Sequence, residues 1–406
     1  MNILLINHYA GSPDLGMEYR PYYMASQWKK MGHNVLIVCA SQAHVRTKQF
    51  DIKKDIEYKT IEGIEYLILK TPEYQGNGAK RVLNMFSFVW GLWKNAPKIA
   101  KSFKPNFVIA SSTYPLDIYP ARKIAKKSGA KLVFEVHDLW PLSPMELGNM
   151  SKYHPFIFLM QQAENYAYKY CNHVISMLPK TQEHMKNHGL DLQKWHYIPN
   201  GILLNESENI SLDSELITKL SDWKKNGYFL VAYTGGLGIS NALEYLLEAA
   251  TMLENSAIKI LIFGSGPERK KLEDMCVSLH LQNVEFMGQV NKKQIPELLQ
   301  MMDVLYLGWR KNPLYRFGIS PNKLMDYMYS AKPIIHSVNA GNDLVAESNC
   351  GISVEAENAP MIAKAILDLK KMPDQNRLEL GKNANNFVRQ NHDYTKLAAD
   401  FLHFLE

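Results

Sequence analysis

A segment in the last quarter of the chain carries residue types suited to binding a phosphorylated ligand. It runs Arg316-Phe317-Gly318-Ile319-Ser320-Pro321-Asn322-Lys323-Leu324-Met325-Asp326. A turn containing Gly318 leads into a predicted helix, for which Ser320 is the expected N-cap and Pro321 fits the first position. The unpaired N–H groups and the dipole at a helix start attract phosphate, and Lys323 adds a positive charge there.

The spacing of three polar residues places them on one face of this helix. Asp326 follows Lys323 by three residues and Asn322 by four. A carboxylate at that position can accept hydrogen bonds from a ribose while Lys323 and the helix start hold a diphosphate. The segment therefore indicates a sugar-nucleotide site, although an ordinary capped core helix with a solvated Lys and Asp has the same pattern.

A second candidate is His137, which ends the predicted strand in Glu135-Val136-His137-Asp138. An imidazole at a strand end can donate to a sugar hydroxyl or take part in proton transfer. Asp138 either orients His137 or caps the next element, and we favour the cap.

Glycine-bearing turns follow several predicted strands. Gly11, Gly16 and Arg20 belong to the first loop and the start of its helix; glycine allows a phosphate to approach the backbone, and Arg can grip an anion. Turns at 234–238 and at Gly264-Ser265-Gly266 follow later strands. Residues 6–20 lack G-x-G-x-x-G, and the chain has no P-loop, G-x-S-x-G or H-E-x-x-H. No D-x-D lies near a strand end, which disfavours metal-dependent sugar transfer.

Short apolar runs alternate with helical patterns in two series, which predicts an α/β fold of two doubly wound domains. Strands are expected at 2–7, 35–40, 107–110, 131–137 and 174–176, then at 229–233, 259–263, 284–286, 304–307 and 333–336. We expect domains at 1–204 and 205–385, with 205–213 as linker and a helix at 386–406 crossing back to the first domain. Ligands bind beyond the carboxyl ends of such strands, so the candidate loops are expected to line one interdomain cleft.

Composition is that of a globular protein: 406 residues, 46% hydrophobic and 21% charged. No apolar run of about 18 residues predicts a transmembrane helix, and the first seven residues read as a core strand rather than a signal peptide. The four cysteines lack zinc-site spacing and are expected to be reduced core residues.

Positive charge gathers in the first half of the chain. Residues 1–200 contain 25 Lys and Arg against 15 Asp and Glu, and no acidic residue lies between Glu73 and Asp117. Within 80–104, basic residues alternate with Phe and Trp, which is typical of a helix on an anionic membrane. A helix that buries its aromatics in the core is the equal alternative; nucleic acid is disfavoured because no recognition motif accompanies the charge.

Several sequence motifs together resemble the family 4 glycosyltransferases, and the resemblance covers nearly the whole chain. The resemblance is carried by Gly32-His33-Asn34-Val35, Ile198-Pro199-Asn200-Gly201-Ile202, Tyr233-Thr234-Gly235, Phe263-Gly264-Ser265-Gly266-Pro267 and Phe286-Met287-Gly288. Glu135 to Pro141 and Pro321-Asn322-Lys323, continued by Asp326-Tyr327-Met328, are most similar to the N-acetylfucosaminyltransferases of bacterial O-antigen and capsule synthesis.

The resemblance implies a two-domain GT-B fold and a retaining, metal-independent transferase that needs no cofactor. It implies a UDP-sugar donor, a polyprenyl-diphosphate-linked saccharide acceptor, and a place at the inner face of the bacterial plasma membrane. A phosphate oxygen of the leaving group would take the acceptor proton. The implied roles are donor-sugar contact for His137, charge for Lys323 and Arg316, and acceptor or phosphate binding for Arg20 and Asn200. The residues implied to bind the donor are Gly16, Gly235, Gly264, Gly266, Gly318, Ile319, Ser320, Asn322 and Asp326.

The chain departs from the family at its charged positions. Gly318 stands where a sugar-binding glutamate is common, Asp326 replaces a second glutamate, and Gly236 and Asn241 replace an Arg or Lys. Lys323, with Arg316, would supply the missing charge. Two alternatives stay open: a sugar-nucleotide 2-epimerase, disfavoured by the few carboxylates in these loops, and a non-catalytic glycosyltransferase-like subunit.

Overall fold

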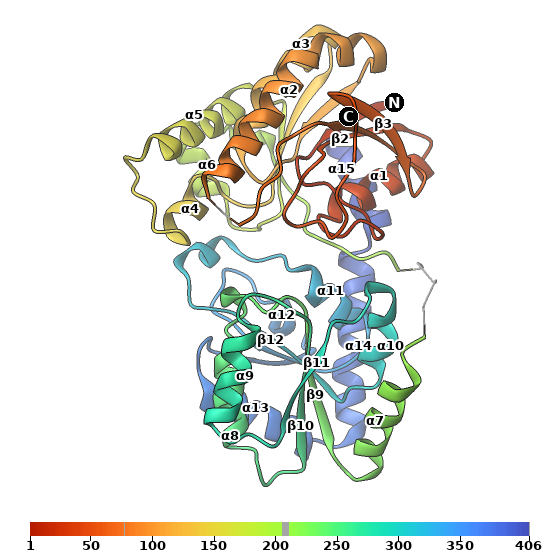
Figure 1. Cartoon of the computed structure of the whole chain (residues 1–406), viewed down its shortest axis with the longest axis vertical. Helices are drawn as coiled ribbons and strands as arrows, with labels where there is room; N and C mark the ends of the chain where they lie inside the picture. Colours follow the sequence, from red (N-terminus) through yellow and green to blue (C-terminus); the bar gives the residue numbers. More distant parts are fainter. Residues whose placement is uncertain (77, 205–210, 406) are drawn as a thin grey trace. The chain divides into compact units, whose positions relative to one another are not determined.

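The computed structural model describes residues 1–76, 78–204 and 211–405 (Figure 1). The chain forms two compact units. The N-terminal unit comprises Met1–Asn200 with Tyr394–Glu406, and the C-terminal unit comprises Gly201–Asp393. The division after Asn200 precedes the boundary expected after residue 204, and the returning segment starts at Tyr394 rather than at residue 386. Most of the expected linker, 205–210, lies outside the described residues.

The N-terminal unit is built on a sheet of order β3-β4-β2-β1-β5-β6-β7-β8. All neighbouring strands are parallel except β3 and β4, which form an antiparallel hairpin that the sequence patterns did not predict. The strands are β1 (Asn2–Ile6), β2 (Asn34–Ala40), β3 (Ile56–Ile61), β4 (Ile64–Leu69), β5 (Phe107–Ala110), β6 (Lys131–Val136), β7 (His173–Ser176) and β8 (Trp195–Tyr197).

Helices flank this sheet because its inner strands are apolar on both faces and must be covered on both. The helices are α1 (Arg20–Lys30), α2 (Ala79–Phe103), α3 (Ile118–Ser128), α4 (Leu142–Glu146), α5 (Pro155–Tyr170), α6 (Gln182–Asn187) and α15 (Tyr394–Leu405). The last of these, α15, packs on α1: the Trp28 indole donates to the Ala398 carbonyl at 3.1 Å and lies edge-on to Phe401.

The C-terminal unit has an all-parallel sheet of order β11-β10-β9-β12-β13-β14. Its strands are β9 (Phe229–Thr234), β10 (Ile258–Phe263), β11 (Val284–Gly288), β12 (Val304–Gly308), β13 (Ile334–Ser337) and β14 (Gly351–Val354). The helices are α7 (Ser214–Lys225), α8 (Leu243–Thr251), α9 (Arg269–Ser278), α10 (Ile295–Gln300), α11 (Asn322–Tyr329), α12 (Leu344–Glu347), α13 (Ala359–Lys371) and α14 (Asp374–Asn391).

The core of this unit has two layers, one on each face of the sheet. One layer joins the sheet to α8 and α13, and the other joins it to α7, α10, α11 and α14. Every predicted strand exists within two residues, and the predicted α/β class with two Rossmann-like units is confirmed.

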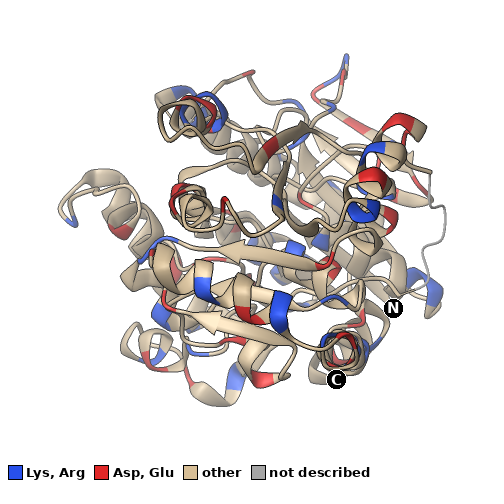
Figure 2. Cartoon of the chain, turned by 90° about the horizontal axis from the view of Figure 1, so that it is seen from below, with Lys and Arg blue, Asp and Glu red and all other residues tan. Residues whose placement is uncertain are grey.

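Surface and composition expectations can be compared with the described residues. No helix among them is long and apolar enough to span a bilayer. Cys39, Cys171 and Cys350 are buried thiols as expected, whereas Cys276 is only half-buried. Acidic and basic residues are interspersed along the ribbon in Figure 2.

Candidate active site in two clusters

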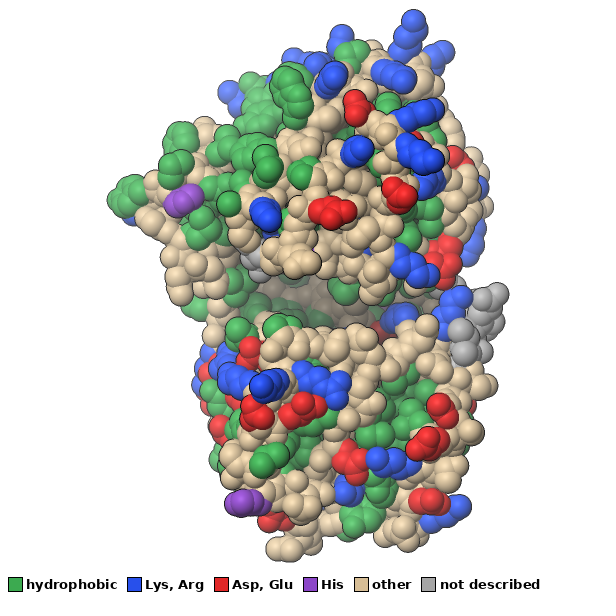
Figure 3. Space-filling model, in the orientation of Figure 1, with side chains coloured by type: hydrophobic (Ala, Val, Ile, Leu, Met, Phe, Trp, Pro, Cys, Tyr) green, Lys and Arg blue, Asp and Glu red, His purple; other side chains and the backbone are tan. Residues whose placement is uncertain are grey.

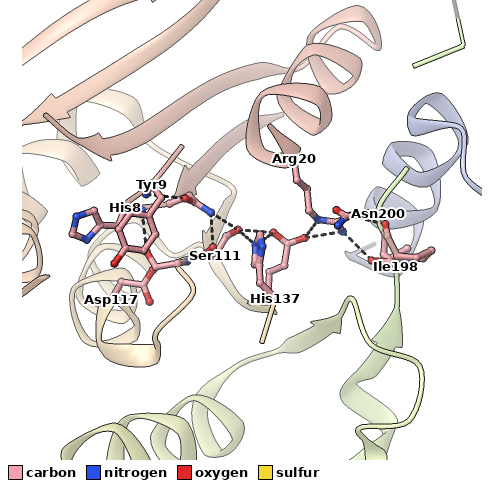
Figure 4. Close-up of polar contacts among 12 residues, drawn as sticks. His8, Tyr9, Arg20, Ser111, Asp117, His137, Ile198 and Asn200 are labelled. Atoms are coloured by element: carbon pink, nitrogen blue, oxygen red, sulfur yellow. Dashed lines mark hydrogen bonds and ion pairs between the residues drawn. The ribbon is translucent and has the colours of Figure 1, made fainter. Parts of the chain in front are cut away.

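The end of β6 in the N-terminal unit carries a buried ion pair that the sequence patterns did not single out. Glu135 is 3% exposed, and its Oε1 accepts from Nε of Arg20 at 3.0 Å. The remaining nitrogens of Arg20 donate to the carbonyl oxygens of Pro199 and Ile198, at 2.5 and 3.0 Å. The guanidinium therefore ties α1 to β6 and to the segment after β8 (Figure 4).

This geometry changes the role expected for Arg20. Its side chain is fully buried and all three of its nitrogens donate within the unit, so it does not face an anionic ligand as predicted. Asn200 is likewise buried, and its Oδ1 accepts from the Tyr394 hydroxyl at 3.5 Å. Arg20 therefore positions Glu135, and Asn200 contacts the first residue of α15.

His137 lies against the same carboxylate. Its Nε2 is 2.9 Å from Oγ of Ser111 and 3.4 Å from Oε2 of Glu135. Burial opposes ionisation of the imidazole, but the Glu135 carboxylate raises the pKa of His137 above its ordinary value. Burial also opposes ionisation of Glu135, yet Arg20 and the hydrogen bonds from His137 and Ser111 hold the pKa of that carboxyl at about 2. The imidazole is thus favoured in its protonated, donating form.

Ser111 completes this network. Its hydroxyl donates to Glu135 at 2.5 Å, and its carbonyl accepts from Nδ2 of Asn7 at 2.6 Å. Asn7 follows β1 and Ser111 follows β5, so neighbouring strand ends hold the His137 ring in place. The signal available in the sequence was a carboxylate, Glu135, within the apolar run that follows Lys131 in β6.

Gly16 and Asp138 do not have the contacts expected of them. The Gly16 N–H donates to the Ser12 carbonyl at 2.9 Å, and a side chain there would clash with Thr47, so this glycine closes a turn instead of offering its N–H to a phosphate. Asp138 does not cap α4, whose N-cap is Pro141. It is exposed and lines a small hollow with Glu135 and Trp140.

In the C-terminal unit, Lys323 reaches from α11 to the loop after β9. Its Nζ donates to the Tyr233 hydroxyl and to Oδ1 of Asn241, each at 2.7 Å. Both partners are neutral, and no carboxylate pairs with this amine among the residues described. Burial lowers the pKa of Lys323 to about 7. The result is a half-buried cation at the carboxyl edge of a parallel sheet, without a counter-charge.

Three glycines make this approach possible. A Cβ at Gly235, whose φ is +143°, would lie 3.1 Å from Nζ of Lys323. A Cβ at Gly264 would lie 1.8 Å from the Gly235 carbonyl oxygen, and one at Gly266 would lie 2.3 Å from that of Leu237. The loops after β9 and β10 are therefore packed backbone against backbone. Gly264 and Gly266, which were predicted to bind the donor, permit this close packing.

The turn before α11 differs from its prediction. The N–H of Gly318 donates to the Tyr315 carbonyl and that of Ile319 donates to Oδ1 of Asn342. Nδ2 of Asn342 returns a hydrogen bond to the Ile319 carbonyl. These two N–H groups are therefore used inside the unit and are not directed at a diphosphate.

The start of α11 also lies one residue later than predicted. The helix begins at Asn322, which is half-buried, and its N-cap is Pro321, with no capping side-chain hydrogen bond. The expected Ser320 cap is therefore wrong. Arg316 is exposed and donates to the Pro313 carbonyl at 2.5 Å, so it does not join Lys323.

Lys323 and Asp326 contact different segments although they share the helix. One Asp326 oxygen accepts from Nζ of Lys292, which follows β11, at 2.5 Å. Lys323 contacts the loop after β9 instead. Since β10 lies between β9 and β11, the two side chains reach separate loops along the carboxyl edge of the sheet.

One group of potential metal ligands occurs among the described residues. Glu164, His184 and His188 place their ligand atoms within 4.8 Å of one another. Both Glu164 oxygens already accept hydrogen bonds, from Tyr168 and Gln161, so we assign no metal there.

Two doubly wound units with polar side chains beyond their parallel strands are the arrangement of the GT-B fold, which the solved structures similar to this chain share. Two family models agree, and together they match most of the chain. One, described as Glycosyltransferase Family 4, matches residues 16–206, and the other, described as Glycosyl transferases group 1, matches residues 219–387. The chain belongs to the GT-B glycosyltransferases.

Individual relatives are distant. The chain is 22% identical over 356 residues to WcaI of Escherichia coli K12, whose name assigns it to colanic acid biosynthesis; the match covers 85% of this chain and 86% of WcaI. D-rhamnosyltransferase WbpZ of Pseudomonas aeruginosa is 27% identical over 42% of this chain and 44% of its own. Among solved structures, Anabaena HepE in complex with UDP has a TM-score of 0.70 at 15% identity, covering 100% of this chain and 99% of HepE.

Proposed function

We propose that this chain transfers a sugar from a UDP-linked donor to a saccharide carried on a polyprenyl diphosphate, with retention of configuration and without a metal. The donor sugar is an N-acetylated deoxy sugar, and the product is a bacterial surface polysaccharide such as O-antigen or capsule. The name of WcaI, putative colanic acid biosynthesis glycosyl transferase, supports the polysaccharide product, the name of WbpZ supports sugar transfer, and the UDP bound to HepE supports the UDP-linked donor.

The observation that carries the proposal is the uncompensated amine of Lys323. Its two partners, Tyr233 and Asn241, are neutral and fix its position without cancelling its charge. A departing nucleoside diphosphate gains negative charge as the glycosidic bond breaks, so a fixed cation stabilises the transition state more than the ground state. Lys323 takes the place of the Arg or Lys that Gly236 and Asn241 replace.

The remaining residues receive supporting roles. His137, protonated and held by Glu135 and Ser111, donates a hydrogen bond to the donor sugar. Asp326 accepts from the ribose hydroxyls beside Lys292, as a carboxylate with a free oxygen can. No carboxylate acts as nucleophile; an oxygen of the departing phosphate takes the acceptor proton.

Titration calorimetry with UDP tests the role of Lys323. Removing a charge-assisted contact costs about 1.5–3 kcal/mol, so Lys323→Ala is expected to weaken UDP binding roughly ten- to hundredfold. Arg316→Ala is the matched control, because that exposed cation precedes the same helix and donates to the Pro313 carbonyl. Equal affinity of Lys323→Ala and wild type would place the diphosphate elsewhere.

A thermal-shift screen against UDP-, GDP- and TDP-sugars identifies the donor. Incubating the stabilising donor with and without membranes that hold the acceptor lipid then identifies the reaction. Transfer that requires the membranes is the expected result. Isomerised nucleotide sugar in their absence would identify an epimerase, and binding without any turnover would identify a non-catalytic subunit.

The surface of α2 supports a membrane-bound acceptor. The helix buries Met85, Phe88 and Leu92 but exposes an apolar stripe on its other side. That stripe consists of Leu83, Phe86, Trp90 and Trp93, exposed by 60%, 41%, 67% and 39%. Figure 3 shows hydrophobic side chains gathered on the N-terminal unit over α2 to α5. The alternative of a helix that buries its aromatic residues therefore holds for Phe88 but not for Phe86, Trp90 and Trp93.

Basic residues border this stripe. Lys80, Lys94, Lys98 and Lys101 are exposed on the same helix. Each Lys near an anionic leaflet contributes about 1 kcal/mol. Replacing Lys94, Lys98 and Lys101 with Gln is expected to lower co-sedimentation with phosphatidylglycerol vesicles about 100-fold, while replacing the exposed Lys364, Lys371 and Lys382 leaves it unchanged. If both triple variants lost vesicle binding equally, the net charge of the protein and not the position of the lysines on α2 would explain the binding.

A further inference from the structure

Four side chains that the proposed function leaves unused meet beyond the carboxyl ends of the N-terminal sheet. Tyr9 follows β1, His44 follows β2, Tyr74 follows β4, and Arg81 lies in the first turn of α2. Because β4, β2 and β1 are adjacent parallel strands, their carboxyl ends share one edge of the sheet. Ligands of doubly wound domains bind at such an edge.

Arg81 and Tyr9 form the charged part of this cluster. Nε of Arg81 lies 3.4 Å from the Tyr9 hydroxyl, and the guanidinium carbon lies 5.6 Å from the Tyr9 ring centroid. Tyr9 itself is 3% exposed, so it positions Arg81 rather than touching a ligand. Arg81 also belongs to the stretch without acidic residues between Glu73 and Asp117.

His44 adds a donor whose direction is fixed. Its backbone N–H donates to the Tyr74 hydroxyl oxygen at 3.1 Å, and that hydroxyl lies 2.7 Å from Nδ1 of the ring. We assign the hydroxyl proton to Nδ1, which leaves the ring proton on Nε2. His44 is exposed at the surface, and desolvation of its ring, with the charge of Arg81, lowers the pKa of His44, so the ring is neutral near neutral pH.

A fixed cation beside a fixed neutral N–H donor suits one ligand chemistry. Guanidinium groups bind phosphate oxygens through parallel hydrogen bonds, and an imidazole N–H can donate to a phosphate or to a sugar oxygen. That chemistry is a diphosphate ester joined to a sugar. Two molecules of the reaction contain it, the donor nucleotide sugar and the lipid-linked acceptor.

The position of Arg81 on α2 favours the acceptor. The exposed stripe of the same helix runs from Leu83 to Trp93. Trp93 is 12 residues after Arg81, or about 18 Å along the helix axis. We propose that Arg81 and His44 bind the diphosphate and first sugar of the prenyl-diphosphate acceptor, and that Tyr9 and Tyr74 position them. This inference rests on the proposed function, because it takes the acceptor class from it.

Titration of farnesyl-diphospho-N-acetylglucosamine and of UDP into Arg81→Gln tests the inference. We expect the farnesyl ligand to bind at least tenfold more weakly than to wild type, with UDP affinity unchanged. Arg122→Gln is the matched control: Arg122 is also half-buried, lies 3.5 Å from the Tyr170 ring centroid, and lies outside the cluster. Farnesyl N-acetylglucosaminide, which lacks the diphosphate, should bind Arg81→Gln and wild type equally.

Other outcomes are equally decisive. Unchanged binding of the farnesyl diphosphate ligand to Arg81→Gln overturns the inference, and a matching loss of UDP affinity would assign the cluster to the donor. If Arg81→Gln does not fold, His44→Phe serves instead, since it retains the aromatic ring beside Tyr9 and loses Nε2–H; a threefold or greater loss is expected. If wild type binds the farnesyl ligand through Arg81 but does not bind UDP, the proposed donor fails while this site stands.

Discussion

The two polar clusters of this enzyme contain the same kind of element, a positive side chain buried beside strand ends, in opposite electrostatic states. In the N-terminal unit, Arg20 is paired with Glu135 at 3.0 Å and its charge is cancelled. In the C-terminal unit, Lys323 is held by Tyr233 and Asn241, and its charge is not cancelled. The first arrangement stabilises structure, whereas the second costs stability and leaves a cation for an anionic ligand.

The difference explains why charged residue type alone is a poor guide to function. Arg20 and Lys323 are both basic, and both follow a glycine-bearing loop in the sequence. Only the partners distinguish them, and those partners lie 115 and 90 residues away, in Glu135 and Tyr233. Removing Arg20 should therefore affect stability far more than removing Lys323.

The largest effect is expected for stability in Arg20→Met. The substitution leaves the Glu135 carboxylate and the carbonyls of Ile198 and Pro199 buried without their donor, at a cost of about 3–5 kcal/mol. Lys323→Met removes a desolvated charge and is expected to change unfolding free energy by less than about 1 kcal/mol. Thermal and urea unfolding measure the loss of unfolding free energy in the two variants. Equal destabilisation would contradict the proposed difference between Arg20 and Lys323.

The fold could be predicted from the sequence because it depends on local patterns. Apolar runs such as 229–233 and 259–263 report buried parallel strands directly. The hairpin β3–β4 could not be predicted in this way, because its strand Ile56–Ile61 is half-exposed and mixes Glu and Lys with apolar residues. The Ser320 cap was misplaced because caps depend on one φ,ψ pair, which the sequence does not determine.

The site was only partly predictable because roles depend on long-range contacts. Lys323 was identified, and its partner Asn241 was recognised only as a missing charge. Glu135 is part of the motif around His137, but no pattern in the sequence indicates that Glu135, Ser111 and Asn7 hold His137. Gly318 and Ile319 were expected to offer N–H groups that Tyr315 and Asn342 already accept.

A glycine pair tests how closely the Lys323 cluster is packed. Gly235→Ala places a Cβ 3.1 Å from the amine at a φ of +143°, which L-residues rarely adopt. We expect a loss of about 2 kcal/mol in unfolding free energy and weaker UDP binding, because the amine must move. Gly236→Ala, with nothing within 4 Å of its Cβ, is the control and should behave as wild type. Matching behaviour of the two variants would show that the amine position is not constrained.

The pH dependence of UDP binding distinguishes an uncompensated cation from a paired one. The pKa of Lys323 is about 7 in the folded protein, below the 10.5 of an exposed Lys, so its contribution to stability rises with pH between these values. A bound diphosphate favours the ammonium form, so UDP binding takes up a proton, and affinity should fall roughly tenfold between pH 7 and 8.5. Calorimetry in two buffers of different ionisation enthalpy measures the uptake. Lys323→Met should abolish both effects; a pH profile that survives in it would assign the titration to another group.

The smallest effect separates the ribose from the diphosphate at the carboxyl edge of the C-terminal sheet. Asp326 is paired with the partly exposed Lys292, and such a pair contributes at most about 1 kcal/mol to stability. Asp326→Asn should therefore leave unfolding nearly unchanged. Loss of a charged acceptor for the ribose hydroxyls is expected to weaken UDP binding about fivefold while leaving inorganic pyrophosphate binding unaffected, whereas Lys323→Met should weaken both. A parallel loss for both ligands in Asp326→Asn would mean that Asp326 acts by orienting the phosphate-binding side of α11, and that the cation and the carboxylate on this helix form one site.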